Sequence, residues 1–301
     1  MSTELLKTIT RPPFANYDIV VYFGGGLFFL PILFHYYISP FNLRLPKFQF
    51  VSDTPWANDI ISSLCLIFSV YIIGHAIAYF SSQIIERSVE SFSGKTSSTV
   101  LSTSLSLPGS RNNVLRSLIT KQFKNSFRTY NWLASSFRIA PHIPLMPFYF
   151  LLYIFGIFGA FSSRIPSTII DKAKLRLSER QYREIIISES ESWFKPVEHY
   201  VINKNPAAIP RMYNYLIISG LFRSMSLIFL IVIWAEIYYF LHHYITGHDH
   251  VALFMSDTHE TFAKMNAFLV AISAYFFSLF SFIKFQRRYV EETIFAFVFG
   301  D

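Results

Sequence analysis

Five of the nine histidines fall between His242 and His259, within and just after the stretch HHYITGHDH. Imidazole nitrogens are common zinc ligands, and an exposed histidine titrates close to neutral pH, so the cluster could be a metal site or a pH sensor. His248 and His250 are two residues apart and can face the same way in an extended loop, where His243 could complete a zinc site. The alternative is an ordinary polar loop that joins two helices.

Four further ionisable side chains lie inside long apolar stretches: His35, His75, Arg223 and Glu236. An ionisable group inside a membrane is costly, which makes each of them a functional hypothesis. At about 1.5 Å per residue, His75 and Arg223 both lie roughly 13 to 15 Å from the inner boundary and could share one polar layer. His35 and Glu236 are matched in depth near the outer boundary, where an imidazole and a carboxylate could pair.

The alternative for these four residues is a purely structural role. Arg223 would extend towards the inner surface, Glu236 would reach the outer water, and His75 would make one hydrogen bond between helices.

Sequence motifs of enzymes are not found in the chain. It contains no G-x-S-x-G, H-E-x-x-H, G-x-x-x-x-G-K-[ST] or G-x-G-x-x-G pattern. Its one cysteine, Cys65, excludes a disulfide or a multi-thiolate metal site within one chain. We therefore expect a protein that is not an enzyme and that needs no cofactor.

The elements that carry these side chains are predicted to be membrane-spanning helices. Hydrophobic residues make up 52% of the chain and charged residues only 15%, and about 20 apolar residues of helix are enough to cross a bilayer. The fold class expected is an all-α membrane protein, with four transmembrane helices and a helical cytoplasmic domain inserted between spans two and three. The predicted ranges are 19–39, 59–85, 213–243 and 264–298 for the spans and 86–212 for the inserted domain.

The distribution of basic residues predicts the orientation. Residues 84–140 carry eight Lys or Arg and residues 164–214 carry nine, whereas 244–263 carry none. Because basic loops stay on the cytoplasmic side, residues 1–18, the inserted domain and the C-terminus should be cytoplasmic, and 244–263 should form an outer His-rich loop. The net charge of +7 is thus explained by topology, and we expect no nucleic-acid partner.

The inserted domain contains two segments of special character. Residues 91–110 include eleven Ser or Thr and no periodic apolar pattern, which indicates a mobile loop. Residues 139–163 are apolar enough to cross, but a fifth span would place the two basic stretches on opposite sides of the membrane. Pro141, Pro144 and Pro147 also break up a helix there, so this segment is interpreted as re-entrant, interfacial or buried.

Small residues predict close helix packing. Gly74, Ala78 and Ser82 repeat every four residues in span two, a spacing that lets helix backbones approach each other. The glycines 24–26 in span one permit the same. The pattern does not reveal whether the partner helix belongs to this chain or to a neighbouring copy.

These features favour a multi-pass membrane protein that forms a homo-oligomeric pore or channel-like assembly, gated or regulated through its cytoplasmic domain. Four mostly apolar helices cannot enclose a water-filled path, so conduction would have to run between subunits. The expected partners are the lipid bilayer, further copies of the chain, and a cytoplasmic protein or small-molecule regulator, in the plasma (cell inner) membrane. The alternatives are a membrane scaffold or signalling subunit, and a metal- or proton-linked transport component.

Overall fold

The computed structural model of the chain describes residues 14–38, 55–93, 96–97, 100, 140–148, 165–178, 194–246 and 260–300. Nearly all of these residues are helical, and no strand occurs among them. Four helices are long and apolar enough to cross a membrane: Asp18–Ile38, Asp59–Glu90, Ile209–His242 and Phe268–Phe299. The predicted all-α class and the four candidate spans are therefore confirmed.

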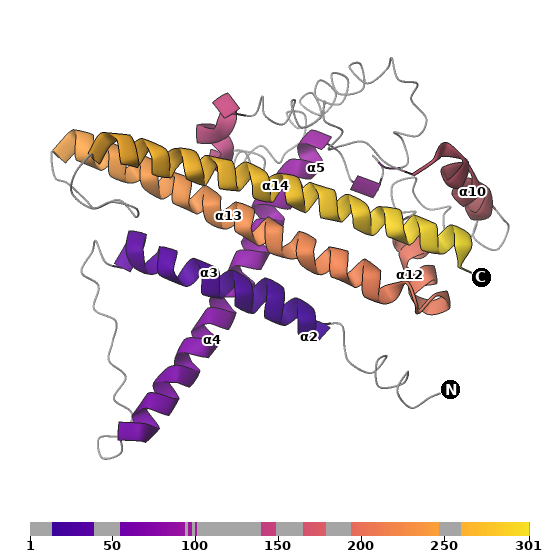
Figure 1. Ribbon diagram of the computed structural model, residues 1–301, viewed down its shortest axis with the longest axis horizontal. Helices are drawn as coiled ribbons and strands as arrows, with labels where there is room; N and C mark the ends of the chain where they lie inside the picture. Colours follow the sequence, from indigo (N-terminus) through magenta and orange to yellow (C-terminus); the bar gives the residue numbers. More distant parts are fainter. Residues whose placement is uncertain are drawn as a thin grey trace, which may run out of the picture.

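Two long helices pack together and supply most of the hydrophobic core of the molecule. Helix α13, Ile209–Thr246, and helix α14, Glu260–Phe299, lie side by side over most of their length (Figure 1). Pro210 stands in the first turn of α13, where a missing backbone donor is tolerated. Their apolar side chains, among them the fully buried Ile228, Ile233 and Tyr275, form most of the larger hydrophobic core.

The first span runs alongside α13 and in the same direction. It consists of four pieces in one helical path: α2 (Phe14–Tyr17), η1 (Asp18–Phe23), α3 (Gly24–Leu33) and η2 (Phe34–Ile38). The residue numbers at its contacts with α13 increase together on both helices, which shows that the two run in the same direction. These contacts are Gly25 with Ser224, Phe28 with Phe229 and Tyr36 with Glu236. Parallel spans must start on the same side of the membrane.

The second span crosses the other helices at a steep angle instead of running alongside them (Figure 1). It comprises α4 (Pro55–Ser81), η3 (Ser82–Glu86) and α5 (Arg87–Ser93). Gly74 and Glu86 of this span are separated by about 18 Å of helix. Gly74 nevertheless lies against Tyr22 and Glu86 pairs with Arg223. Tyr22 and Arg223 are at nearly the same level along the first span and α13. The apolar stretch has 32 residues, which extend about 48 Å as an α-helix. A helix of this length exceeds the ~30 Å thickness of the hydrocarbon core and fits the bilayer by tilting.

A second, smaller core joins the end of α14 to the beginning of α13. Helices α10 (Ser167–Ser178) and α12 (Phe194–Lys204) pack there (Figure 1). The buried side chains include Ile170, Val201, Met212, Ile294 and Phe297. These two helices come from the inserted segment, and they lie at the same end of the α13–α14 pair.

Arg176 of α10 caps the C-terminal end of α14. Its guanidinium donates to the carbonyl oxygens of Phe297 at 2.6 Å, Val298 at 3.4 Å and Gly300 at 3.4 Å. The last carbonyls of a helix lack intrahelical donors and carry partial negative charge, so a cation there is stabilising. The same guanidinium lies over the Phe297 ring, 5.3 Å from its centroid.

We expect Arg176→Ala to destabilise this end of the molecule by about 1 to 2 kcal/mol. Hydrogen exchange of the amides in the last two turns of α14 should become faster. Lys172→Ala is the matched control, since Lys172 is an exposed cation on the same helix and its replacement should leave exchange unchanged. Equal effects of the two replacements would contradict the cap.

The proline-rich segment packs against the long helices. Ala140–Phe148 forms η4, a 3-10 helix in which His142 and Leu145 are buried. The Trp234 indole donates to the carbonyl oxygen of Pro141 at 2.8 Å. The rest of 139–163 lies outside the described residues. Of 91–110, residues 91–93 end α5 and the described residues 96, 97 and 100 are also helical.

Candidate functional site

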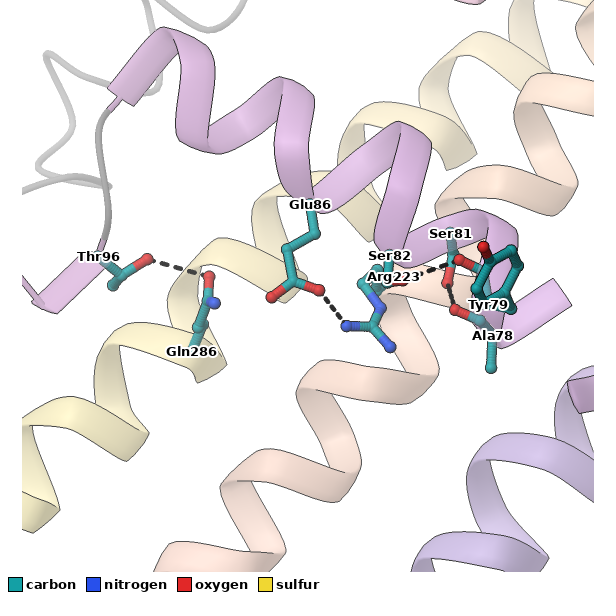
Figure 2. A network of polar contacts seen from close by, with 8 residues as sticks. All are labelled: Ala78, Tyr79, Ser81, Ser82, Glu86, Thr96, Arg223 and Gln286. Atoms are coloured by element: carbon teal, nitrogen blue, oxygen red, sulfur yellow. Dashed lines mark hydrogen bonds and ion pairs between the residues drawn. The ribbon is translucent and has the colours of Figure 1, made fainter. Parts of the chain in front are cut away.

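An ion pair inside the bundle is the centre of the candidate site (Figure 2). Arg223 lies 14 residues after the first residue of α13, about 21 Å along the helix. Its Nη1 donates to the Oε2 of Glu86, the last residue of η3. The side chains are 15% and 27% exposed, respectively, and the Arg223 Nε is buried without a hydrogen-bond partner. Arg223 therefore depends on Glu86 for charge compensation.

The turn before Glu86 positions its carboxylate. Residues Ser82–Glu86 form a π-helical turn, which holds more residues per turn than an α-helix. Ser81 and Ser82 donate to the carbonyls of Ala78 at 2.9 Å and Tyr79 at 2.8 Å, and such bonds to preceding carbonyls bend helices. Figure 2 shows these bonds beside Arg223.

A second polar contact ties the same region to α14. Thr96 donates to the Oε1 of Gln286 at 3.0 Å (Figure 2). The chain that leaves α4 is thus joined to α13 through Glu86 and to α14 through Thr96.

His75 has aromatic neighbours. Its ring stacks on Tyr22 with centroids 3.7 Å apart and meets the edge of Tyr71 at 4.5 Å. His75 and Arg223 do lie at a similar level, since Tyr22 precedes Gly25, the residue beside Ser224. Each nevertheless has its own partner, because Arg223 pairs with Glu86 and His75 stacks on Tyr22.

The polar contact at Glu236 is made by tyrosines. Tyr36, the residue after His35, donates to the buried carboxylate of Glu236. Tyr239 in turn donates to the Tyr36 carbonyl oxygen. The His35 ring stands edge-on to the Tyr36 ring, 5.1 Å between centroids. Among the described contacts, the group that binds the Glu236 carboxylate is the phenol next to His35.

All three of these contacts involve π-helical turns. Tyr22 lies in η1, Tyr36 in η2 and Glu86 in η3. π-Turns are rare and often mark functional sites, because the extra residue turns a side chain away from its α-helical direction. In this molecule each described π-turn presents a polar or aromatic side chain to a neighbouring span.

Of the predicted packing residues, Gly74 meets the first span of the same chain. A Cβ at Gly74 would lie 1.7 Å from the carbonyl oxygen of Tyr22, and one at Gly26 would lie 1.9 Å from that of Val70. The two backbones touch at this crossing. Ala78 is buried, whereas Ser82 bonds within its own helix.

The proposed zinc ligands are only partly within the described residues. His243 lies near the end of α13, and His248 and His250 lie outside the described ranges. Within those ranges no group of three or more His, Cys, Asp or Glu could hold a metal ion.

The fold and these contacts define a multi-pass helical membrane protein whose spans are joined by a few polar contacts. No protein-family model, curated protein or solved structure matches the chain. Function must therefore be inferred from the molecule itself.

Proposed function

We propose that the chain forms a homo-oligomeric, channel-like assembly in the plasma membrane, regulated through the segment between α4 and α13. The observation that carries the proposal is the Glu86–Arg223 ion pair. Arg223 is a charge within a span, and Glu86 is the residue at which the helix that continues α4 leads into that segment. Movement of the segment would act directly on a charge inside the bundle.

The energetics of the pair support a regulatory role. Removing charges from water is costly, and a pair of this kind contributes less to stability than its geometry suggests. Because both side chains keep some exposure, the pair can open without leaving two fully desolvated ions. An ion pair with two accessible states is a suitable switch between conformations.

The exposure of the second span supports the oligomer. In its most apolar stretch of 18 residues only 17% is buried, whereas the corresponding stretches of the two long helices are 50% buried. Its exposed surface includes Asp59, Ser62, Ser63 and Ser69 as well as large apolar side chains. Polar groups on a span favour a water-lined or protein-covered face over a purely lipid-covered one. A path between subunits would use this face.

Conductance tests this function. Purified protein in planar bilayers should conduct, and Glu86→Gln should change the open fraction by at least about tenfold, which corresponds to about 1.4 kcal/mol of differential stabilisation. The matched control is Glu292→Gln, which breaks the largely exposed ion pair with Arg211, away from that face, and should leave gating unchanged.

Two results would count against this proposal. Protein that is correctly folded but never conducts would favour the scaffold or signalling alternative. A monomer in detergent and in lipid would exclude a path between subunits.

A further inference from the structure

The 3-10 helix η4 has one packed face and one uncovered face. Residues three apart lie on the same face of a 3-10 helix. His142 and Leu145 lie in the interior, with only 4% and 0% of their surfaces exposed. Ile143 and Met146 are 56% and 55% exposed. The remaining face is formed by the prolines Pro141, Pro144 and Pro147. A large apolar surface of η4 is thus left without a protein neighbour among the described residues.

Two contacts give the position of η4 along the bundle. The His142 Nδ1 lies 3.0 Å from the Tyr275 hydroxyl. Tyr275 stands near the middle of residues 268–283 of α14, which carry no charge, and about 10 to 12 Å of helix separates it from each end of that stretch. The Trp234 indole, which donates to the Pro141 carbonyl oxygen, stands about 18 Å from the end of α13. η4 therefore lies at the level of the apolar middle of the two long helices.

The described chain on both sides of η4 lies at one end of the bundle. Val100 precedes η4 and Ile165 follows it, and both are buried in the smaller core at the end of α14. The helices of this core carry exposed ionisable side chains, including Asp171, Lys172 and Lys204. Such groups are too costly to place in hydrocarbon, so this end of the bundle belongs in water. The chain must reach η4 from that end and return to it.

We propose that Ala140–Phe148 is a re-entrant segment, which enters the bilayer from the side of the smaller core and presents Ile143 and Met146 to the lipid acyl chains. A segment that crossed the membrane would leave Val100 and Ile165 at opposite ends of the bundle, whereas the smaller core contains both. A segment on the membrane surface would not reach the middle of α14. This placement depends on the candidate spans and not on conduction.

The prolines of η4 suit a segment within the bilayer. Unsatisfied backbone donors are costly in hydrocarbon, and proline has no backbone N–H. The carbonyl oxygen of Pro141 accepts a hydrogen bond from the Trp234 indole at 2.8 Å. Residues that would break a membrane-crossing α-helix thus reduce the number of polar groups that this short helix carries into lipid.

The contact with lipid can be tested on the full-length protein in phosphatidylcholine vesicles. Cys65→Ser removes the native cysteine, and Met146→Cys supplies a site for a nitroxide label. Phe277→Cys, at a 63% exposed position of α14, is the lipid-facing reference, and Lys172→Cys on α10 is the water-facing reference. The ratio of collision rates with oxygen and with a polar nickel chelate should be at least about tenfold higher at position 146 than at 172, because polar solutes enter hydrocarbon poorly.

Ile143→Cys repeats the measurement at the second exposed position of η4 and covers the case in which Met146→Cys does not fold. Both labels should give collision ratios close to that of Phe277→Cys. Ratios equal to that of Lys172→Cys would mean that η4 faces water and would overturn the proposal.

Sidedness distinguishes a re-entrant segment from a crossing one. Ser97→Cys and Ser167→Cys, each combined with Cys65→Ser, place single thiols before and after η4 at partly exposed and exposed positions. A membrane-impermeant maleimide, applied to intact and to permeabilised cells, should reach both thiols from the same side of the membrane. Labelling from opposite sides would show a fifth span and would refute the re-entrant placement. Neither measurement records conductance, so this proposal and the channel are tested separately.

Discussion

Gly74→Ala is expected to separate α4 from the first span and to destabilise the protein by about 3 kcal/mol or more. The added Cβ would lie 1.7 Å from the Tyr22 carbonyl oxygen and 2.5 Å from its carbonyl carbon. Both are backbone atoms, which cannot turn aside as a side chain can. The two helices would have to move apart, and the contacts on both sides of the crossing would be lost.

Gly26→Ala should have a similar effect, because its Cβ would lie 1.9 Å from the Val70 carbonyl oxygen. Gly25→Ala is the matched control. Its Cβ would meet the Ser224 Cβ at 3.8 Å, an ordinary contact, and alanine favours a helix over glycine by about 1 kcal/mol. The control should therefore be neutral or stabilising.

Thermal unfolding in detergent, followed by the loss of monodisperse protein, measures all three variants. Unchanged midpoints for Gly74→Ala and Gly26→Ala would show that the helices do not touch as described.

Breaking the Glu86–Arg223 ion pair should have an asymmetric effect on stability. Glu86→Gln leaves the less exposed partner, Arg223, without its counter-charge, whereas Arg223→Gln leaves a carboxylate that can still reach solvent. We expect Glu86→Gln to cost about 2 to 3 kcal/mol and Arg223→Gln distinctly less, since an uncompensated buried charge is the dominant penalty. The double replacement should cost less than the sum of the two.

The exposed pair of Arg211 and Glu292 is the control for this cycle. Its nitrogen and oxygen are 3.2 Å apart, but the Arg211 side chain is 68% exposed, so its coupling energy should be below about 1 kcal/mol. Reversible unfolding by SDS provides the free energies for both cycles. Equal coupling in the two pairs would mean that burial has no influence on the internal pair.

The helices could be predicted from the sequence because the decisive signal is local. A run of about 20 residues without charge is sufficient to indicate a span, and the structure contains all four such helices. A close approach of another helix at Gly74 could also be predicted, because glycine has no side chain to keep the two backbones apart. Its partner, Tyr22 of the same chain, depends on tertiary packing and has no local signal.

The polar contacts were harder to predict for a definite reason. The depth of a residue in the membrane was counted along ideal α-helices. This count assumes that the direction of side chains around each helix axis is regular and that all spans are parallel. π-Turns at residues 18–23, 34–38 and 82–86 change the phase, and the crossing of α4 brings Glu86 to the level of Arg223. The predicted span ends at residue 85, so Glu86 falls just outside the set of ionisable residues expected within the membrane. An acid one residue beyond that boundary, opposite an arginine within another span, was the available signal.

The steep inclination of α4 has a mechanical consequence for a protein in a lipid sheet. A tilted helix occupies more area in the plane of the membrane than an upright one of the same length. A rearrangement that brought α4 upright, parallel to the two long helices, would reduce the footprint of the molecule. Lateral tension does work in proportion to that change in area, and any agent shifts an equilibrium only by its differential effect on the two states. Stretching the membrane would therefore stabilise the crossed arrangement, and slackening it would favour the upright one.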